Sequence, residues 1–452
     1  MGSPPRHAPP QATKAATQRR NDDERLPVVL VLTVPPAQRD LEQEREDEMR
    51  ALLDTAGCEV VAVARQHLAR PVKSTYIGSG KAKEIWDLVE DHEALEVVFD
   101  VSLTPSQERN LEKLLEIKVV DYTALILHIF ALGARTHQSM LAVELAQLEH
   151  NRSRLKRLWS HLDRIKAGMN MRGPGEKQLE TDRRLVDLRI ADLKAKLKTI
   201  EDRKERTIAA RDNCVKIALV GYTNAGKSTV MNALTDSDVL AQDRLFATLD
   251  TRTSRLDLDH HHDIVLSDTV GFIRNLPHKL VASFHATLAE VVEANLLLHV
   301  VDASQPSMEE HIHAVESVLS DIGAVDIPTI MVFNKCDQPH SQTLTLAFRK
   351  RYPGSVMISA KHGDGLDELK NEILRFVNNR EEVVRVRFSA GDGALYAFIR
   401  GRAQVVEEDF VGNDALLTIR ADDRLLTELA DNDHCQIERP QEPFHDPWVS
   451  GK

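Results

Sequence analysis

The fold is decided by one stretch of sequence, Lys216-Ile-Ala-Leu-Val-Gly-Tyr-Thr-Asn-Ala-Gly-Lys-Ser-Thr229. Its residues 217–220 form an apolar run typical of a buried strand, and Gly221–Ser228 matches the spacing G-x-x-x-x-G-K-[ST] in full. The residues after Ser228 can open a helix. A strand, loop and helix in this order point backbone N–H groups at phosphate oxygens, and the helix N-terminus adds a favourable dipole. The stretch therefore predicts an α/β domain that binds nucleotide phosphates.

Three shorter elements follow in the chain and bear on the base. Asp268-Thr-Val-Gly271, Asn334-Lys-Cys-Asp337 and Ser359-Ala-Lys361 each follow an apolar strand, and they resemble the D-x-x-G, N-K-x-D and S-A-K elements of GTPases in the same order. A carboxylate at Asp337 can accept from both N1–H and the N2 amine of guanine, whereas adenine would leave it unpaired. The combination favours guanine. An ATP-using enzyme is the weaker alternative.

Each element has an expected role around GTP and Mg²⁺. Lys227 would reach the β- and γ-phosphates, and the Ser228 hydroxyl would ligate Mg²⁺. Asp268 would hold Mg²⁺ through water, and the Gly271 N–H would bond the γ-phosphate. A backbone N–H of the S-A-K element would meet guanine O6.

The segment Phe246-Ala-Thr-Leu-Asp250 fits a switch loop in which Thr248 closes over Mg²⁺ and the γ-phosphate, with Thr251 and Thr253 as nearby alternatives. The predicted catalytic residues are Lys227, Thr248 and Gly271, and the predicted metal ligands are Ser228, Thr248 and, through water, Asp268. The predicted nucleotide contacts are Gly221, Tyr222, Thr223, Asn224, Ala225, Gly226, Lys227, Ser228, Thr229, Phe246, Ala247, Thr248, Leu249, Asp250, Asp268, Thr269, Val270, Gly271, Asn334, Lys335, Cys336, Asp337, Ser359, Ala360 and Lys361.

Phe272 occupies the position after Gly271, where Ras-type GTPases place a glutamine that orients the attacking water. A phenylalanine cannot hydrogen-bond water. The sequence therefore predicts slow intrinsic hydrolysis, with water positioned by another group or by a partner. Simple packing of Phe272 in the interior is compatible with this prediction.

Composition bounds the class of protein. The chain has 452 residues, of which 42% are hydrophobic and 28% charged, so it is long enough for about three folded domains and is not disordered throughout. The four cysteines lie far apart, which argues against a zinc ribbon or a disulfide scaffold and suits a reducing cytoplasm. No apolar run approaches the ~18 residues of a membrane span.

The remaining sequence divides by pattern. Apolar runs at 26–34, 58–63, 95–101 and 117–120 alternate with helix-prone segments, which predicts a small α/β domain with a largely parallel sheet. After residue 140, leucines spaced by fours and threes run on either side of Gly173-Pro-Gly175, which predicts an antiparallel helical hairpin, with two ordinary core helices as the alternative.

The predicted fold class is therefore α/β and multidomain. It comprises an N-terminal α/β domain, an antiparallel helical hairpin, a P-loop GTPase domain with a mostly parallel sheet, and a small α+β C-terminal appendage. The expected boundaries are a disordered tail at 1–25, the N-terminal domain at 26–139, the hairpin at 140–212, the GTPase domain at 213–380, the appendage at 381–439 and a tail at 440–452.

The net charge of −12 conceals an uneven distribution. Residues 149–212 contain 18 Lys plus Arg against 11 Asp plus Glu, a local charge of +7 that leaves −19 on the rest of the chain. We call residues 149–212 the basic arm. Its positive charge suits binding to the phosphates of a folded RNA, whereas a solvated helical surface without a partner is the alternative. The candidate phosphate-binding side chains are Arg152, Arg154, Lys156, Arg157, Arg164, Lys166 and Arg172.

Beyond the nucleotide elements, the chain resembles the HflX GTPases of the Obg–HflX group over roughly residues 26–378. The segments that carry the resemblance are Tyr76–Lys81, Leu103–Leu111, Ala134–His137, Val143–Leu148, Arg172–Glu176, Gln178–Arg184, Gly221–Thr229 and Asp268–Asn275. The resemblance implies a GTP- and Mg²⁺-dependent cytoplasmic protein that is monomeric when free. It also implies binding to the large ribosomal subunit and its RNA, and a part in ribosome splitting, rescue or assembly, with the hairpin loop reaching RNA.

Three alternatives stay open at this point. An RNA-binding scaffold with a mainly structural GTP site competes with the GTPase switch. Gly78-Ser-Gly-Lys81 could belong to a second nucleotide site, although a turn into a helix is the simpler interpretation. The run Asp259-His-His-His-Asp263 could hold a metal, although adjacent residues on a tight turn rarely converge on one ion.

Overall fold

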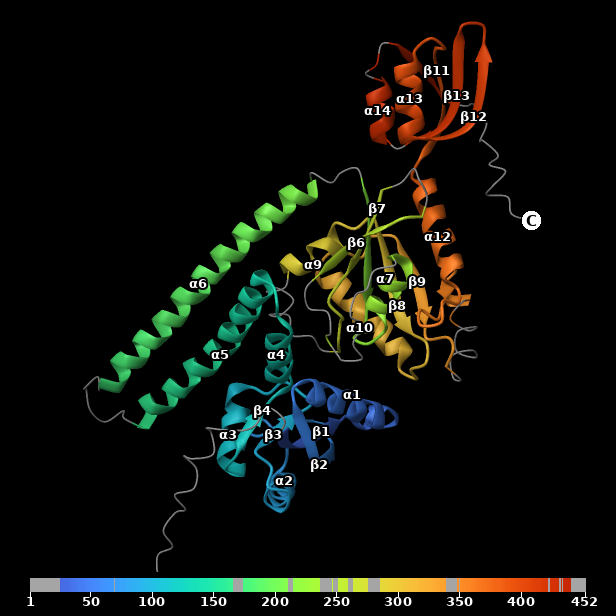
Figure 1. The fold of residues 1–452 in the computed structure, drawn as a ribbon. Coiled ribbons are helices and arrows are strands. Elements are labelled where there is room, and N and C mark those ends of the chain that lie inside the picture. The colour runs from blue at the N-terminus through green and yellow to red at the C-terminus, as the bar shows by residue number, and fades with distance from the viewer. Residues whose placement is uncertain are drawn as a thin grey trace, which may run out of the picture. The chain divides into compact units, whose positions relative to one another are not determined.

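The computed structural model describes residues 25–68, 70–165, 174–209, 214–235, 246, 251–258, 263–274, 285–338, 348, 350–421, 423–430, 432 and 434–439. The chain divides into two compact units. One consists of Met1–Leu132 and Val143–Ile190, and the other of Gly133–Ala142 and Ala191–Lys452. Figure 1 shows the elements in chain order by colour.

The first unit contains a four-stranded, fully parallel sheet in the order β2-β1-β3-β4. Its strands are β1 (Leu26–Val34), β2 (Cys58–His67), β3 (Glu96–Phe99) and β4 (Lys118–Val120). The accompanying helices are η1 (Pro36–Leu41), α1 (Glu42–Thr55), α2 (Ser79–Asp91), α3 (Pro105–Leu115) and α4 (Tyr122–Gly133). The predicted parallel α/β domain is confirmed, and α4 is an addition that the sequence pattern did not predict.

Local sequence signals explain where these elements begin and pack. Thr104 caps α3 through a reciprocal capping box with Gln107, and Pro105 occupies the first turn, where its missing N–H costs nothing. Alternate residues of β1, among them Val29 and Val31, pack in one buried cluster with residues of α2 and α3. The period of two along the strand therefore fixes which face receives these helices.

Two long helices follow, α5 (His137–Ile165) and α6 (Pro174–Ala209). Arg189 makes a bidentate pair with Glu144 at 2.8 and 2.9 Å, and Arg152 lies 2.7 Å from Asp187. Because the contacts on α6 move backwards as those on α5 move forwards, the helices run antiparallel, and Figure 1 shows them as neighbours. The predicted helical pair is confirmed.

Ion pairs within the first unit change the interpretation of the basic arm. Arg154 lies 2.6 Å from Glu108 and 3.0 Å from Asp121, and its side chain is only 17% exposed. Arg154 thus already neutralises the buried Asp121 and the partly buried Glu108, which argues against the prediction that it binds RNA phosphate. Arg152 is also paired, while Lys166 and Arg172 lie outside the described residues.

The second unit contains a six-stranded sheet in the order β10-β9-β8-β5-β7-β6, with β6 antiparallel and the other neighbours parallel. Its strands are β5 (Val215–Gly221), β6 (Arg252–Leu256), β7 (Ile264–Asp268), β8 (Leu296–Asp302), β9 (Thr329–Asn334) and β10 (Val356–Met357). The helices of this part are α7 (Lys227–Thr235), α9 (His285–Val292), α10 (Met308–Asp321) and α12 (Leu366–Asn379). The predicted, mostly parallel sheet is confirmed.

The chain ends in a four-stranded antiparallel sheet in the order β12-β13-β11-β14. Its elements are β11 (Glu382–Ser389), α13 (Gly393–Arg402), β12 (Gln404–Val411), β13 (Asp414–Ala421), α14 (Asp423–Ala430) and β14 (Cys435–Glu438). The predicted α+β appendage is confirmed, whereas the domain boundaries stay predictions. Among the described residues, no helix is long and apolar enough to cross a membrane.

Candidate nucleotide-binding site

The phosphate loop lies at the carboxyl end of β5, in the middle of the six-stranded sheet. A Cβ at Gly221 would lie 2.2 Å from the carbonyl oxygen of Val300 on β8, so any other residue would disturb the β5–β8 pairing. Asn224 and Gly226 have φ values of +59° and +91°. These two residues turn the chain tightly into α7, as phosphate binding by successive N–H groups requires.

Lys227 is the first residue of α7 and its side chain is buried. Its Nζ donates to the carbonyl oxygens of Gly221 and Tyr222 at 3.1 and 3.0 Å. Burial lowers the pKa of Lys227 to about 8, and the charge of Asp268 offsets part of this effect. The ammonium is thus held over the loop where negative charge would stabilise it.

Ser228 and Asp268 come together from α7 and the end of β7. The Ser228 hydroxyl donates to Asp268 Oδ2 at 2.6 Å, and Asp268 is fully buried. A hydroxyl and a carboxylate are the hard oxygen groups that Mg²⁺ prefers, so this pair fits the ion. Bound Mg²⁺ would neutralise phosphate charge, with Ser228 as direct ligand and Asp268 acting through water.

The predicted switch loop is described only in part. Ala247, Thr248, Leu249 and Asp250 lie outside the described residues, so the role of Thr248 stays a prediction. Phe246 is buried with φ +58°. Of the alternatives, Thr253 lies on β6 with its hydroxyl 3.4 Å from both Ser267 and Glu290, which turns it toward neighbouring side chains of the sheet and α9.

The segment after Asp268 is joined to the phosphate loop by backbone bonds. The Phe272 N–H donates to the Gly221 carbonyl at 3.1 Å, and the Thr223 N–H donates to the Phe272 carbonyl at 2.8 Å. A Cβ at Gly271 would lie 3.0 Å from Lys227 Nζ, so Gly271 sits directly against the lysine. The Phe272 side chain is 1% exposed and therefore packs in the interior rather than facing an attacking water.

Asn334 connects the phosphate loop to the base end of the site. Its Nδ2 donates to the Ala225 carbonyl at 2.9 Å, and its Oδ1 accepts from the Ala360 N–H at 3.1 Å. A Cβ at Gly226 would lie 2.3 Å from that Nδ2, so a glycine is needed for the bridge to form. Guanine O6 would compete with Asn334 for the Ala360 N–H.

Asp337 and Lys335 are oriented before any base arrives. The Ser359 hydroxyl donates to Asp337 Oδ1 at 2.7 Å and holds the pKa of this carboxyl below its usual range. Lys335 has φ +63°, and its Nζ lies 2.9 Å from the Asn224 carbonyl and 2.7 Å from Asp302 Oδ2. The exposed Asp337 carboxylate therefore stays ionised and can accept two N–H groups of guanine.

The cysteine of this element has a structural role. The Cys336 N–H donates to the Ile358 carbonyl at 3.2 Å, joining the loop after β9 to β10. Burial raises the pKa of its thiol to about 11, so the side chain stays neutral.

Two residues at the site were missed by sequence reasoning. Asp302 holds Lys335, and its place directly after the apolar run 296–301 is a signal that could have found it, because ligand sites lie at the carboxyl ends of parallel strands. His299 is buried on β8, where burial and then the charge of Lys227 lower its pKa to about 3. Its place in the middle of the apolar run 296–301 is the sequence signal that could have indicated its burial.

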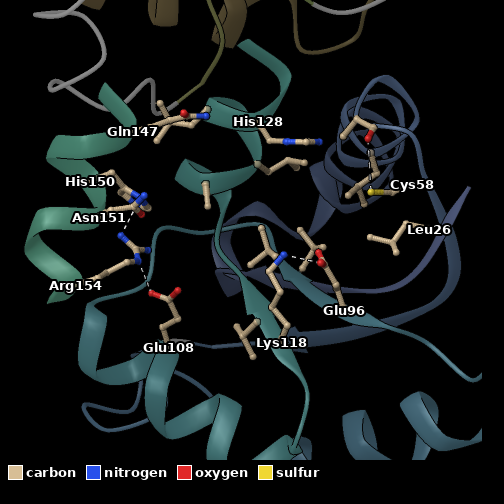
Figure 2. A pocket seen from close by; sticks show the side chains of 18 residues that line it. Leu26, Cys58, Glu96, Glu108, Lys118, His128, Gln147, His150, Asn151 and Arg154 are labelled. Atoms are coloured by element: carbon tan, nitrogen blue, oxygen red, sulfur yellow. Dashed lines mark hydrogen bonds and ion pairs between the residues drawn. The ribbon is translucent and has the colours of Figure 1, made fainter. Parts of the chain in front are cut away.

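A cavity of about 660 Å³ in the N-terminal unit is lined by strands of the sheet and by residues of α1, α3, α4 and α5. Figure 2 shows two ion pairs among the lining side chains, Arg154 with Glu108 and Lys118 with Glu96. Within the described chain, its lining includes no residue of 78–81. Gly78 instead precedes α2, which supports the interpretation of that segment as a turn into a helix, while His260–His262 lie outside the described residues.

We expect Gly226→Ala to weaken GDP binding roughly 10- to 100-fold, because its Cβ would displace the Asn334 amide and leave buried polar groups unpaired. Isothermal titration calorimetry measures the change. Gly323→Ala is the matched control, since Gly323 also has positive φ but open space around its Cβ position. Equal affinities for the two variants would contradict the proposed bridge.

The depressed pKa of Lys227 predicts a pH dependence of nucleotide binding. A phosphate needs the ammonium form and raises its pKa, so affinity is full below pH 8 and falls as pH rises above the free-site pKa of about 8. We expect a slope approaching roughly tenfold per pH unit for this single proton. Titrations between pH 7 and 9.5, in buffers of different ionisation enthalpy, measure the affinity and the proton uptake.

The control for this titration is Lys227→Arg, whose guanidinium keeps its proton throughout the range. Its affinity should be lower overall but independent of pH. A flat profile for the unsubstituted chain would show that Lys227 is not the titrating group.

Comparison with protein-family models finds three that together follow the chain. "GTP-binding GTPase N-terminal" matches residues 43–131, "GTP-binding GTPase Middle Region" matches 133–211, and "50S ribosome-binding GTPase" matches 216–335. The last range holds the phosphate loop and Asn334.

Among curated proteins, "GTPase HflX" of Escherichia coli is 41% identical over 84% of this chain and 90% of its own length. "GTPase HflX" of Flavobacterium psychrophilum is 50% identical over 65% of this chain and 71% of its own length. Among solved structures, a GTP-binding protein from the archaeon Sulfolobus solfataricus in complex with GDP is 23% identical, covering 78% of this chain and 99% of that one with a TM-score of 0.41. On the identity and coverage of the curated relatives, the chain belongs to the HflX family of GTPases.

Proposed function

We propose that this protein is a nucleotide-controlled factor that associates with the large ribosomal subunit and acts in ribosome splitting, rescue or biogenesis. The observation that carries the proposal is the set of bonds that position Lys227, Asn334 and Asp337. Lys227 and Asn334 lie inside residues 216–335, which match a 50S ribosome-binding GTPase family, and Asp337 follows directly after this range. The free protein is a cytoplasmic monomer in this proposal, and part of it is ribosome-associated.

The site residues divide the work between phosphate and base. Lys227, the loop N–H groups of Gly221–Ser228 and the Gly271 N–H bind the phosphates, and Thr248 closes over them. Asp337 and the S-A-K loop read guanine. GTP would order Thr248 and Gly271 around its γ-phosphate, and hydrolysis would release them, which is how nucleotide state would control ribosome binding.

Intrinsic hydrolysis is expected to be slow. The buried Phe272 offers no group to the attacking water, and Lys227 and Gly271 can stabilise phosphate charge without orienting a nucleophile. A partner docking against the switch segments would supply that orientation, so we expect the large subunit to stimulate GTP turnover.

The ion-paired arginines narrow the RNA-binding surface proposed for the basic arm. Arg154 and Arg152 are occupied by carboxylates, so RNA contacts fall to arm residues nearer the Gly173-Pro-Gly175 loop. The alternative function, an RNA-binding scaffold with a structural GTP site, uses the same arm. It differs in predicting no dependence on nucleotide.

We expect the full chain to cosediment with isolated large subunits more strongly in the presence of a non-hydrolysable GTP analogue than with GDP or with no nucleotide. The reason is that only a γ-phosphate can bond Gly271 and Thr248. Equal binding in all three conditions would exclude the switch. Turnover measured with and without subunits separates the alternatives further, because a scaffold predicts no stimulation.

Lys227→Ala completes that experiment, with Lys83→Ala on the exposed face of α2 as the matched control. The first substitution should abolish the nucleotide dependence of cosedimentation and the second should preserve it. Retention of full ribosome-dependent activity by Lys227→Ala would favour the scaffold.

Asp337→Asn tests the base specificity. The amide can donate to the C2 carbonyl of xanthine but no longer accepts both guanine N–H groups, so we expect GTP binding to fall roughly 10- to 100-fold and xanthosine nucleotide binding to rise. Asp364→Asn is the control in the neighbouring S-A-K loop, because Asp364 contacts Ser359 through its backbone carbonyl. An unchanged preference for GTP in Asp337→Asn would mean that Asp337 does not read the base.

A further inference from the structure

Tyr222, the second residue of the phosphate loop, makes three contacts that the motif itself does not require. Its backbone carbonyl accepts from Lys227 Nζ at 3.0 Å. Its hydroxyl accepts from the backbone N–H of Arg274 at 3.0 Å. Its ring stacks on His311 of α10, with centroids 3.9 Å apart and planes inclined by 13°. One residue therefore touches the catalytic lysine, the segment after Gly271 and a neighbouring helix.

The first turn of α10 contacts both Arg274 and Tyr222. Glu310 Oε2 lies 3.2 Å from Arg274 Nη1, and the next residue, His311, carries the stacked ring. His311 Nε2 lies 3.1 Å from the hydroxyl of Ser307, the residue that precedes the helix. The helix thus presents an anion to the Arg274 side chain while Tyr222 binds the Arg274 backbone.

These contacts extend the pairing between the phosphate loop and residues 269–274. Thr269 Oγ1 donates to the Leu219 carbonyl at 2.6 Å, and Phe272 exchanges two backbone bonds with Gly221 and Thr223. The bond from Arg274 to the Tyr222 hydroxyl is the last step in this series. Gly271 lies inside the paired stretch, against Lys227 Nζ.

We propose that Tyr222, with His311 and Glu310, is a positioning residue that fixes residues 271–274 so that the Gly271 N–H faces the γ-phosphate above Lys227. The inference rests on the GTP site proposed above and deepens it. A preformed donor lowers the ordering cost that a γ-phosphate must otherwise meet, whereas GDP makes no bond to Gly271. The arrangement therefore acts on discrimination between GTP and GDP rather than on nucleotide affinity in general.

Tyr222→Phe is the sharpest test, because it removes the hydroxyl and keeps the ring that packs on His311. We expect the affinity for a non-hydrolysable GTP analogue to fall about 3- to 10-fold, the size of one hydrogen bond, with GDP affinity changed less than about twofold. Single-turnover hydrolysis should slow in the same direction. A loss that is equal for both nucleotides, or no loss, would overturn the proposal.

A nucleotide-independent readout keeps the test separate from the proposed function. Hydrogen exchange of the Arg274 amide, followed in the full chain alone, should be faster in Tyr222→Phe, since its acceptor is gone. Unchanged exchange would overturn the inference even if GTP binding behaves as expected. If the unsubstituted chain fails to bind GTP, the proposed function is wrong. Faster exchange of the Arg274 amide in Tyr222→Phe would still support the positioning contact in that case.

Control variants show whether the change in nucleotide preference comes from the contacts around Arg274. Tyr396→Phe removes a tyrosine hydroxyl bonded to Glu408 at 2.8 Å in the C-terminal sheet, and it should leave the nucleotide preference unchanged. Glu310→Gln should produce a smaller shift in the direction of Tyr222→Phe, and the double variant should shift less than the sum, because both partners hold Arg274. A Tyr396→Phe shift as large as that of Tyr222→Phe, or full additivity in the double variant, would contradict the proposal.

Discussion

The side-chain amide of Asn334 is the interaction on which the site depends. It joins three loops that leave different strands, because one atom bonds Ala225 of the phosphate loop and the other bonds Ala360 near the base. The bridge needs empty space at Gly226, so the glycine of the motif serves the base end of the site as well as the phosphates. Lys335 reinforces the same junction by reaching Asn224 and Asp302. The Asn334 amide consequently ties the phosphate loop to the two loops that hold the residues predicted to read the base.

The centre of the site buries charged groups whose desolvation is only partly compensated. Lys227 and Asp268 are buried opposite charges, and the nearby His299 stays neutral because burial and the lysine charge lower its pKa. Carbonyl dipoles of the loop partly compensate the lysine, and its pKa is nevertheless depressed. A bound phosphate would supply the missing negative charge, so the same burial that destabilises the free ammonium strengthens its attraction for phosphate.

Charge is used differently in the N-terminal unit. Arg154 lies between Glu108 and the buried Asp121, and Arg45 lies 3.0 Å from the buried Asp100. A buried carboxylate without such a partner would carry a large desolvation cost, so these arginines are structural. The excess of positive charge in residues 149–212 therefore overstates what the arm can offer to RNA, because counting charges cannot reveal which are already neutralised.

The sequence by itself determined the parallel N-terminal sheet, the helical pair and the nucleotide-binding sheet, because strand and helix periodicities and the glycine spacing are local properties. It also identified the chemistry expected of Lys227, Asp268 and Asp337. Only the tertiary structure showed that Arg154 is occupied, that Phe272 is buried, and that Tyr222 meets Arg274 and His311. Each of these facts depends on residues brought together from distant parts of the chain, and no short sequence pattern encodes such a contact.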